Sequence, residues 1–355
     1  MTTTKNNEHK KLNVPNLRFP EFQGEWEEYR IEDITVNISS GRCKSHSSNG
    51  KYNLYGSTGI IGKTDEACYE GNLVLVARVG ANAGSLQIIN EPCGITDNTL
   101  IIKPKKVDAQ YIYYFLQHFN LNRLIFGSGQ PLITGSMLKK VKISLGNIQE
   151  QNKLTRLLSL LDERIATQSK IIDKLQSLIK GIAQKIVRNN KPNVRLAECL
   201  ECKSSTLQES EVCEQGTYPV YGANGIVGYL DNYSTEGEAV YIIKDGSGVG
   251  TVSYVTGKCS ATGTLNTLQA KEGYSLQYLY YLLKVFNFEP YKTGMAIPHI
   301  YFKDYGKAKV FCPSYTEQLQ YARLLYAIES KLSIEKNILT SLSLQKQYLL
   351  RQMFI

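Results

Sequence analysis

The sequence YGSTGIIGKT at residues 55–64 returns as YGANGIVGYL at residues 221–230, 166 positions further along the chain. Four other strings return at nearly the same spacing: RVGANAG (78–84) as KDGSGVG (244–250), Asn98-Thr99-Leu100 as Asn266-Thr267-Leu268, YIYYFLQHFN (111–120) as YLYYLLKVFN (278–287), and GSGQPLI (127–133) as GMAIPHI (294–300). Solenoid repeats are much shorter, about 20–45 residues. The chain is therefore expected to contain two copies of a whole domain and of the segment that follows it.

The end of the first stretch raises the question of nucleotide binding. A P-loop has the pattern G-x-x-x-x-G-K-[ST], but the first glycine stands at 56 instead of 57. The second copy keeps the glycines and replaces Lys63 and Thr64 by Tyr229 and Leu230. The shared pattern YGxxGIxG predicts a glycine turn without a phosphate-binding lysine.

Short apolar runs between Gly and Asn turn signals predict strands inside each copy, at residues 72–77, 85–89 and 239–243. Residues 111–118 and 276–285 predict short helices packed on these strands. Each copy is therefore expected to be a mixed α and β domain with many loops.

Each copy ends in a segment with the spacing of a coiled-coil seam, in which seam positions alternate steps of four and three. The positions are Leu154, Leu158, Leu161, Ile165, Gln168, Ile172, Leu175, Ile179, Ile182 and Ile186, and then Tyr321, Leu325, Ile328, Leu332, Glu335, Leu339, Leu342, Lys346, Leu349 and Met353. The first helix delivers the chain to the second domain, from which the second helix starts. Two such helices that pack together must run antiparallel, and the repeats are then related by a pseudo-two-fold axis.

Both seams carry a polar residue at the fifth position, Gln168 and Glu335. In an antiparallel pair these side chains face each other, and a polar layer there fixes the helix register at a cost in stability. The alternative is an incidental polar residue at a solvent-exposed helix crossing. A rod of about 35 helical residues is about 50 Å long, or roughly 15 base pairs of DNA, so the pair is expected to act as a ruler.

Composition and charge bound the class of protein. The 355 residues, 42% of them hydrophobic, are typical of a soluble protein with two or three domains. Residues 1–13 lack the apolar core of a signal peptide and no apolar run is long enough to span a bilayer, so a cytoplasmic location is expected. The net charge of +9 permits a nucleic-acid partner, and it is densest at residues 149–189, whereas residues 190–315 are close to neutral.

The sequence lacks motifs for catalysis. We find no methyltransferase, deaminase or hydrolase motif, and the four histidines lack metal-ligand spacing. The eight cysteines are expected to be reduced thiols. Cys199-x-x-Cys202 with Cys213 nearby leaves a zinc site open as the less favoured alternative, because no second ligand pair follows. A non-catalytic binding protein is expected.

These features together resemble the specificity subunit of a type I restriction–modification system. The resemblance is carried by VPNLRF (14–19) with Trp26 shortly after it, YGSTGIIG, ARVGANAG, QPLI (130–133) and Glu150-Gln151. It implies an α+β fold of two similar α/β target recognition domains, related by pseudo-two-fold symmetry and separated by two long antiparallel coiled-coil helices. The expected boundaries are a tail at 1–16, recognition domains at 17–147 and 189–314, a central spacer helix at 148–188 and a C-terminal spacer helix at 315–355.

The resemblance also implies the partners and cofactors. Each domain would recognise one half of a bipartite sequence in double-stranded DNA, and the chain would assemble with two methylation subunits and with restriction subunits. S-adenosylmethionine, ATP and Mg would belong to those partner subunits, and this chain would bind no cofactor of its own. The near-neutral second domain implies weak DNA affinity without the methylation subunits.

By the same resemblance, paired loops would contact DNA. They are 42–44, 51–57, 78–82 and 127–130 in the first domain and 203–205, 221–224, 244–247 and 294–299 in the second. The individual candidates are Arg42, Lys44, Lys51, Tyr55, Ser57, Arg78, Asn82, Ser128, Gln130, Lys203, Ser204, Tyr221, Asn224, Lys244, Ser247 and His299. Such side chains suit contacts to phosphates and base edges, although tyrosine-rich strands are more often half-buried sheet.

Two other functions remain open at this stage. The chain could be an interaction scaffold, in which two α/β modules on a coiled-coil stalk bind proteins or glycans. It could also be a lone DNA methyltransferase, which predicts that this chain binds S-adenosylmethionine by itself.

Overall fold

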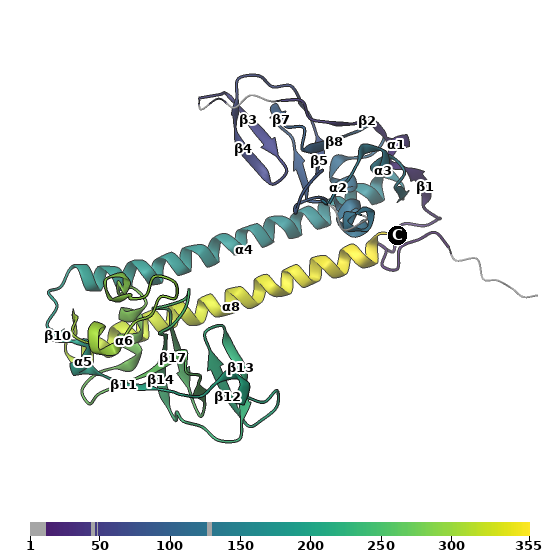
Figure 1. Ribbon diagram of the computed structural model, residues 1–355. Coiled ribbons are helices and arrows are strands. Elements are labelled where there is room, and N and C mark those ends of the chain that lie inside the picture. The colour runs from purple at the N-terminus through teal and green to yellow at the C-terminus, as the bar shows by residue number, and fades with distance from the viewer. Residues whose placement is uncertain (1–11, 44–46, 48, 126–129) are drawn as a thin grey trace, which may run out of the picture. The chain divides into compact units, whose positions relative to one another are not determined.

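The computed structural model describes residues 12–43, 47, 49–125 and 130–355. These residues form two compact units: unit 1 extends to Thr167 and includes Ile338–Ile355, and unit 2 is Gln168–Asn337. Each unit therefore contains one α/β domain and parts of two long helices (Figure 1). Among the described residues, none of the helices has the length and apolar character needed to cross a bilayer.

Unit 1 contains three small sheets and its helices. In chain order the elements are β1 (Glu27–Arg30), α1 (Ile31–Ile34), β2 (Thr35–Ser40), β3 (Tyr52–Gly56), β4 (Gly59–Thr64), β5 (Leu73–Ala77), β6 (Leu86–Ile89), β7 (Cys93–Ile95), β8 (Thr99–Pro104), α2 (Ala109–Phe119), η1 (Leu121–Leu124), α3 (Gly135–Lys139), β9 (Lys142–Leu145) and the start of α4 (Ile148–Arg188). The sheet orders are β2-β8-β5-β6, β4-β3-β7 and β1-β9.

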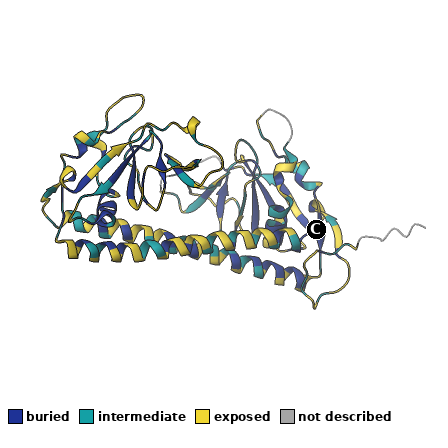
Figure 2. Ribbon diagram, turned by 90° about the horizontal axis from the view of Figure 1, so that it is seen from below, coloured by how far each residue is buried: buried dark blue, intermediate teal, exposed yellow. Residues whose placement is uncertain are grey.

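The apolar runs of the sequence explain the core of unit 1. All five residues of β5 are buried, and the amphipathic α2 contacts β5 and β6. The Asp108 carboxylate caps α2 by accepting from the Gln110 amide at 2.6 Å. Figure 2 shows buried residues along the strands and alternating with exposed ones along the helices. The strands and helices expected in this copy are confirmed.

Unit 2 repeats the same order of elements, with η2 in addition to those described in unit 1. They are the end of α4, β10 (Val194–Arg195), α5 (Leu196–Cys199), β11 (Leu200–Ser204), η2 (Glu209–Glu211), β12 (Tyr218–Gly222), β13 (Gly225–Leu230), β14 (Glu238–Ile243), β15 (Val252–Thr256), β16 (Ser260–Ala261), β17 (Leu265–Ala270), α6 (Leu276–Leu283), η3 (Glu289–Tyr291), α7 (Phe302–Tyr305), β18 (Lys309–Val310) and α8 (Tyr315–Met353). Its sheets, β11-β17-β14-β15, β13-β12-β16 and β10-β18, match those of unit 1 strand for strand.

One part of the sequence alignment between the copies is wrong. In unit 1, Val76 pairs with Leu100, and in unit 2, Ile242 pairs with Asn266. Leu100 therefore corresponds to Asn266, and the match of Asn98-Thr99-Leu100 with Asn266-Thr267-Leu268 was displaced by two residues. The offset stays at 166 through this strand, because β8 and β17 keep the same register with their central neighbours.

The seam positions of both long helices are buried or half-buried throughout, as expected. In unit 1, Leu154 and Leu158 share a core with Leu350 and Met353. In unit 2 the side-chain amide of Gln168 donates to the backbone carbonyl of Glu335 at 3.0 Å. Further along α4, Asp162 pairs with Lys346 in unit 1, and Ala183 lies beside Leu325 in unit 2, so partner numbers on α8 fall as those on α4 rise. The two helices are therefore antiparallel in each unit.

Candidate nucleic-acid interface

A junction of three loops lies at one end of the large sheet in unit 1. The Arg78 amide donates to the Asn98 carbonyl at 2.9 Å, and the Arg78 carbonyl accepts from the Ile133 amide at 2.8 Å. The Gly80 amide donates to the Pro131 carbonyl at 3.0 Å. We call the segments 78–84, 96–98 and 130–133 the loop junction of unit 1. It brings the candidates Arg78, Asn82 and Gln130 together.

Unit 2 builds the same junction from the corresponding residues. The Lys244 amide donates to the Thr264 carbonyl at 3.0 Å, and the Lys244 carbonyl accepts from the Ile300 amide at 2.9 Å. The Gly246 amide donates to the Pro298 carbonyl at 2.9 Å. The loop junction of unit 2, residues 244–250, 262–264 and 297–300, unites the candidates Lys244, Ser247 and His299. The repeat thus extends to individual backbone hydrogen bonds.

A glycine hairpin stands beside each junction. YGSTGIIGKT forms the antiparallel pair β3–β4, in which Gly59 adopts a φ of +123°, and no helix follows it as in a P-loop. The carbonyl of Tyr55 accepts from the Thr96 amide at 3.0 Å, and that of Tyr221 accepts from the Thr262 amide at 2.9 Å. The predicted glycine turn is confirmed in both copies, and it is tied to the junction.

An open hollow of about 560 Å³ lies between the hairpin and the junction of unit 1. The candidates Ser57 and Asn82 line it, and the Ser57 hydroxyl donates to the Asn98 carbonyl at 3.2 Å. The sequence prediction missed other polar residues of this surface, which are Thr58, Thr96, Asp97 and Asn98. Thr96-Asp97-Asn98 is a turn signal in the sequence, but nothing local reveals that the turn lies against the hairpin.

Several candidate side chains are engaged within the protein. The Tyr55 hydroxyl donates to Glu91 at 2.7 Å, and burial together with this carboxylate raises the pKa of Tyr55 to about 12. The Ser204 hydroxyl donates to Asn266 at 2.8 Å. Lys203 donates to Gln269 at 3.3 Å, and the ring of Tyr221 packs on Tyr241 with centroids 5.6 Å apart. For Tyr55 and Tyr221 the structure supports the half-buried sheet residue that the sequence also allowed.

The remaining candidates lie at exposed positions or outside the described chain. Arg42 is exposed in the loop after β2, directly before Cys43, which lines the hollow. Asn224 is exposed at the tip of the β12–β13 hairpin. Lys51 lies at the opposite end of β3 from the junction, with its ammonium 5.3 Å from the ring of Tyr52. Lys44 and Ser128 lie outside the described residues.

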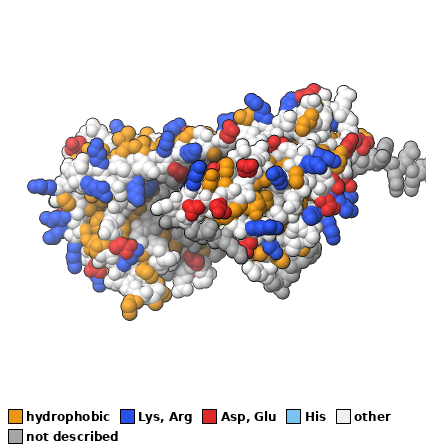
Figure 3. Space-filling model, turned by 90° about the horizontal axis from the view of Figure 1, so that it is seen from above, with side chains coloured by type: hydrophobic (Ala, Val, Ile, Leu, Met, Phe, Trp, Pro, Cys, Tyr) orange, Lys and Arg blue, Asp and Glu red, His pale blue; other side chains and the backbone are white. Residues whose placement is uncertain are grey.

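The segment before each hairpin pairs with it in both units: the Ser47 amide donates to the Lys63 carbonyl at 2.9 Å, and the Cys213 amide donates to the Tyr229 carbonyl at 3.1 Å. In unit 2 the segment that contains η2 approaches the hairpin: the Leu207 carbonyl accepts from the Gly263 amide at 2.7 Å, and a Cβ on Gly222 would lie 3.0 Å from the Glu209 carboxylate. This acidic segment contributes to the near-neutral charge of the second domain. Figure 3 shows Lys and Arg as well as Asp and Glu side chains on the face that it draws. The near-neutral charge of residues 190–315 predicts modest affinity of the second domain alone for phosphates.

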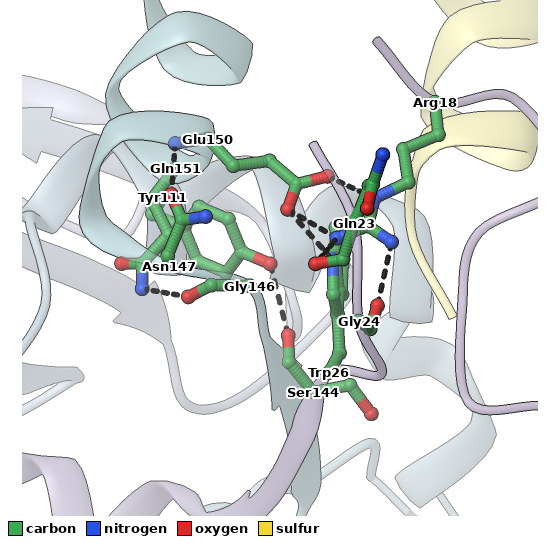
Figure 4. A network of polar contacts seen from close by, with 10 residues as sticks. All are labelled: Arg18, Gln23, Gly24, Trp26, Tyr111, Ser144, Gly146, Asn147, Glu150 and Gln151. Atoms are coloured by element: carbon green, nitrogen blue, oxygen red, sulfur yellow. Dashed lines mark hydrogen bonds and ion pairs between the residues drawn. The ribbon is translucent and has the colours of Figure 1, made fainter. Parts of the chain in front are cut away.

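A buried polar network fastens the α/β domain of unit 1 to α4 (Figure 4). Glu150, at the start of α4, accepts from the Arg18 guanidinium at 2.7 Å and 2.8 Å and from the Trp26 indole at 3.1 Å. Arg18 also donates to the Gly24 carbonyl at 2.6 Å. In unit 2 the corresponding Glu317 accepts from the Ser314 amide at 3.1 Å and is exposed. The network orients unit 1's domain on its helix.

Two of the cysteines considered for a zinc site, Cys199 and Cys213, lie in different surroundings. Cys199 is buried and its thiol donates to the Leu196 carbonyl at 3.4 Å, whereas Cys213 is exposed and pairs through its backbone with Tyr229. Within the described residues, His, Cys, Asp and Glu form no cluster of three that could hold a metal ion.

Comparison with known proteins identifies the family. The model of the type I restriction modification DNA specificity domain matches twice, at residues 23–177 and 190–344. A Mycoplasma genitalium protein named as a type I specificity subunit is 26% identical over 339 residues, 86% of this chain and 87% of its own length. The specificity subunit of the Escherichia coli EcoprrI enzyme is 29% identical over 112 residues, 32% of this chain and 28% of its own.

A solved structure supports the same fold. The crystal structure of the type I restriction-modification system S subunit from M. genitalium aligns with a TM-score of 0.73, covering 96% of this chain and 99% of that one at 21% identity. The two matches of the family model coincide with the two copies found in the sequence, and together they span most of the chain. The protein belongs to the type I restriction–modification DNA specificity family.

Proposed function

We propose that this chain recognises a bipartite DNA sequence, with one half-site contacted by the loop junction of each unit. The proposal rests on one observation. The loop junction has equivalent backbone hydrogen bonds in both units but carries different side chains. Arg78, Asn82 and Gln130 in unit 1 correspond in place to Lys244, Gly248 and Ile297 in unit 2. A rigid frame that carries variable polar side chains suits the recognition of two different sequences.

The chain acts within a larger complex. As a specificity subunit it would bring two methylation subunits to the DNA and, for cleavage, restriction subunits, which would supply S-adenosylmethionine, ATP and Mg²⁺ chemistry. The near-neutral charge of residues 190–315 supports this division of work, because much of the affinity for phosphates would come from the partners. The complex would work in the cytoplasm, where its DNA is.

The two long helices would set the distance between the half-sites. Deleting four residues, about one turn, from each helix shortens the rod by about 6 Å, or roughly two base pairs. The recognised sequence should keep both halves and lose spacer length. The contact between Gln168 and Glu335 would hold the register of the pair, so these residues should stay when the deletions are placed on either side of them.

The experiment is methylation mapping with the complete complex of this chain and its methylation subunits. Asn82→Ala should relax or change the first half-site only, and Ser247→Ala the second half-site only, since both side chains are exposed on their junctions. Lys307→Ala, an exposed lysine outside the junctions, is the matched control and should leave both unchanged. Replacing residues 17–147 by another recognition domain should exchange the first half-site as a unit.

Two results would contradict the proposal. Methylation without any sequence preference, or no sequence-dependent gel retardation in the presence of the methylation subunits, would favour an interaction scaffold. A single variant that altered both half-sites would show that the units do not act separately.

A further inference from the structure

A short hairpin projects from the loop junction of unit 2. The Thr293 amide donates to the His299 carbonyl at 2.9 Å and the His299 amide donates to the Thr293 carbonyl at 2.8 Å, which closes a tip of residues 294–298. Two apolar side chains stand on this tip in water. Met295 is fully exposed, at 106% of its reference area, and Ile297 is 64% exposed. Exposed apolar residues on a binding loop need an explanation more than exposed polar ones do.

The tip is held rigidly. Gly294 has a φ of +87°, and a Cβ there would lie 2.4 Å from the Ile297 carbonyl, so this tight turn requires glycine. The His299 ring contacts the Ile297 carbonyl at 3.2 Å, and the Pro298 carbonyl accepts from Gly246. The tip cannot fold back to bury Met295 without breaking these bonds. The apolar surface is thus preorganised for an external ligand.

The surroundings of the tip favour DNA as that ligand. The hairpin is joined to Lys244 through the Ile300 amide, which places the tip on the surface proposed to meet the second half-site. His299 and Tyr301 pack edge to face with centroids 5.0 Å apart, and the Lys303 ammonium lies 5.0 Å from the Tyr301 ring. An apolar tip with cationic and aromatic neighbours suits a groove with phosphates on either side.

The grooves of B-DNA offer one clearly apolar group on a base edge, the C5 methyl of thymine in the major groove. Methionine and isoleucine have the chemistry for this contact. The corresponding segment of unit 1 has the sequence GSGQP at residues 127–131, and its described residue Gln130 is exposed. A glutamine suits hydrogen bonding to adenine. At the position of Ile297, unit 1 therefore presents a polar side chain, Gln130.

On the basis of the proposed DNA recognition, we infer that Met295 and Ile297 pack against the methyl group of a thymine in the half-site contacted by unit 2. This assigns a specificity-determining pair that lacks any hydrogen-bonding group. It also requires that at least one thymine lie in the second half-site.

A mutant cycle between protein and DNA tests the inference. Methylation mapping first gives the recognised sequence, and each thymine of both half-sites is then replaced singly by deoxyuridine, which removes only the methyl group. Binding is measured by retardation with the complete complex containing the methylation subunits, for the wild-type chain and for the variants Met295→Ser and Ile297→Ser. These exposed side chains do not support the core, so the variants should fold.

One deoxyuridine in the second half-site should weaken wild-type binding about fourfold, the effect of about one buried methyl group. The same deoxyuridine substitution should hardly change the DNA binding of at least one serine variant. Deoxyuridine in the first half-site should act equally on all proteins. Leu324→Ser, which removes a 51% exposed aliphatic side chain from α8, is the matched control and should retain the wild-type response.

The inference is overturned if every deoxyuridine affects wild-type and serine variants equally, or if the second half-site lacks thymine. It is also overturned if the variants lose the methylation subunits while deoxyuridine has no effect, because the tip is then a protein contact. Failure of the proposed function is distinguishable, since the wild-type complex would then show no sequence-dependent retardation with unmodified DNA.

Discussion

In both units a tyrosine of the domain donates a hydrogen bond to a carboxylate of a long helix. The lysine that neutralises this carboxylate comes from a different element in each unit. Tyr114 of α2 donates to Asp162 of α4 at 2.9 Å, and in the other copy Tyr281 of α6 donates to Glu329 of α8 at 2.7 Å. The cation in unit 1 is Lys346, on the opposite long helix, at 2.6 Å from Asp162. In unit 2 it is Lys284, within the recognition domain, at 2.9 Å from Glu329.

This difference shows what the repeat has preserved. The hydrogen bond that places each domain on its helix is common to both copies, whereas the source of the countercharge is free to change. In unit 1 the ion pair also joins α4 to α8, and in unit 2 it joins the domain to α8. The ion pair to this carboxylate therefore supports helix–helix packing in unit 1 and domain–helix packing in unit 2.

The largest expected difference between the copies concerns the residue that begins each spacer helix. Glu150→Ala removes a carboxylate that is 2% exposed and leaves Arg18 and the Trp26 indole without their acceptor. We expect a loss of about 3–5 kcal/mol in the free energy of unfolding of unit 1. Glu317→Ala removes only the hydrogen bonds that this carboxylate accepts from the Ser314 amide and hydroxyl, which are worth about 1 kcal/mol.

Hydrogen exchange measures these losses separately in the two units, because each unit has its own protected amides. Equal losses for the two variants would show that the Arg18 network adds nothing beyond a helix cap. Glu150→Gln is the isosteric control, since it keeps the size of the side chain and removes the charge.

A smaller effect is expected at the ion pairs that differ between the units. Lys284→Met and Lys346→Met should each cost about 1–3 kcal/mol, because the carboxylates they leave are only partly exposed. The two losses should appear in different places: Lys284→Met should loosen the recognition domain of unit 2, and Lys346→Met should loosen the end of α8. If hydrogen exchange rose at the same amides in both variants, the two lysines would not stabilise different parts of the protein.

The pH dependence of unit 2 provides a second measurement on the same pair. Burial of Glu329 opposes its ionisation, but hydrogen bonds from Lys284 and Tyr281 outweigh this and hold the pKa below its ordinary value of 4.5. Because the folded-state pKa is depressed, this stabilisation is fully present above about pH 4.5 and is lost as the pH falls through the folded-state pKa. Denaturation of Lys284→Met followed from pH 6 to pH 3 should therefore show a shallower loss of stability than wild type.

The polar contact on the helix seam should have a smaller effect on stability and a larger one on spacing. Replacing Gln168 and Glu335 together by leucine removes the hydrogen bond between them and joins the apolar positions on either side. The denaturation midpoint should stay or rise, because apolar packing replaces a polar layer. The methylated sites should become mixed in spacer length, and a single unchanged spacer would show that other contacts fix the register.

Sequence periodicity predicted the elements and the helix seam well, because both depend on residues close together in the chain. Leu158 and Leu325 occupy equivalent seam positions and are both fully buried. The alignment of the two copies was wrong by two residues at Asn98, because it matched three identical residues. The correct alignment follows from the strand register, which only the pairing with β5 and β14 reveals.

The candidate site was predicted less completely. Tyr55 and Tyr221 lie on the strands β3 and β12 beside the loop junctions, but the direction of their side chains depends on Glu91 and Tyr241, which lie far away in sequence. The exposure of Met295 was hidden for the same reason. An apolar residue in a loop gives no sign of exposure until the hydrogen bonds that hold the tip away from the core are known.

The smallest expected effect returns to the hairpin of unit 1. The Lys63 ammonium donates to Asn53 at 2.7 Å on an exposed strand, and the second copy has Tyr229 at this position. Lys63→Ala should change the free energy of unfolding by no more than about 0.5 kcal/mol. It should also leave the ATP consumption of the complete complex unchanged, since β4 continues a hairpin and provides no helix terminus for a phosphate. A large loss of ATP consumption with normal DNA binding would restore nucleotide binding to this loop, whereas a change confined to the first half-site would extend the recognition surface along β4.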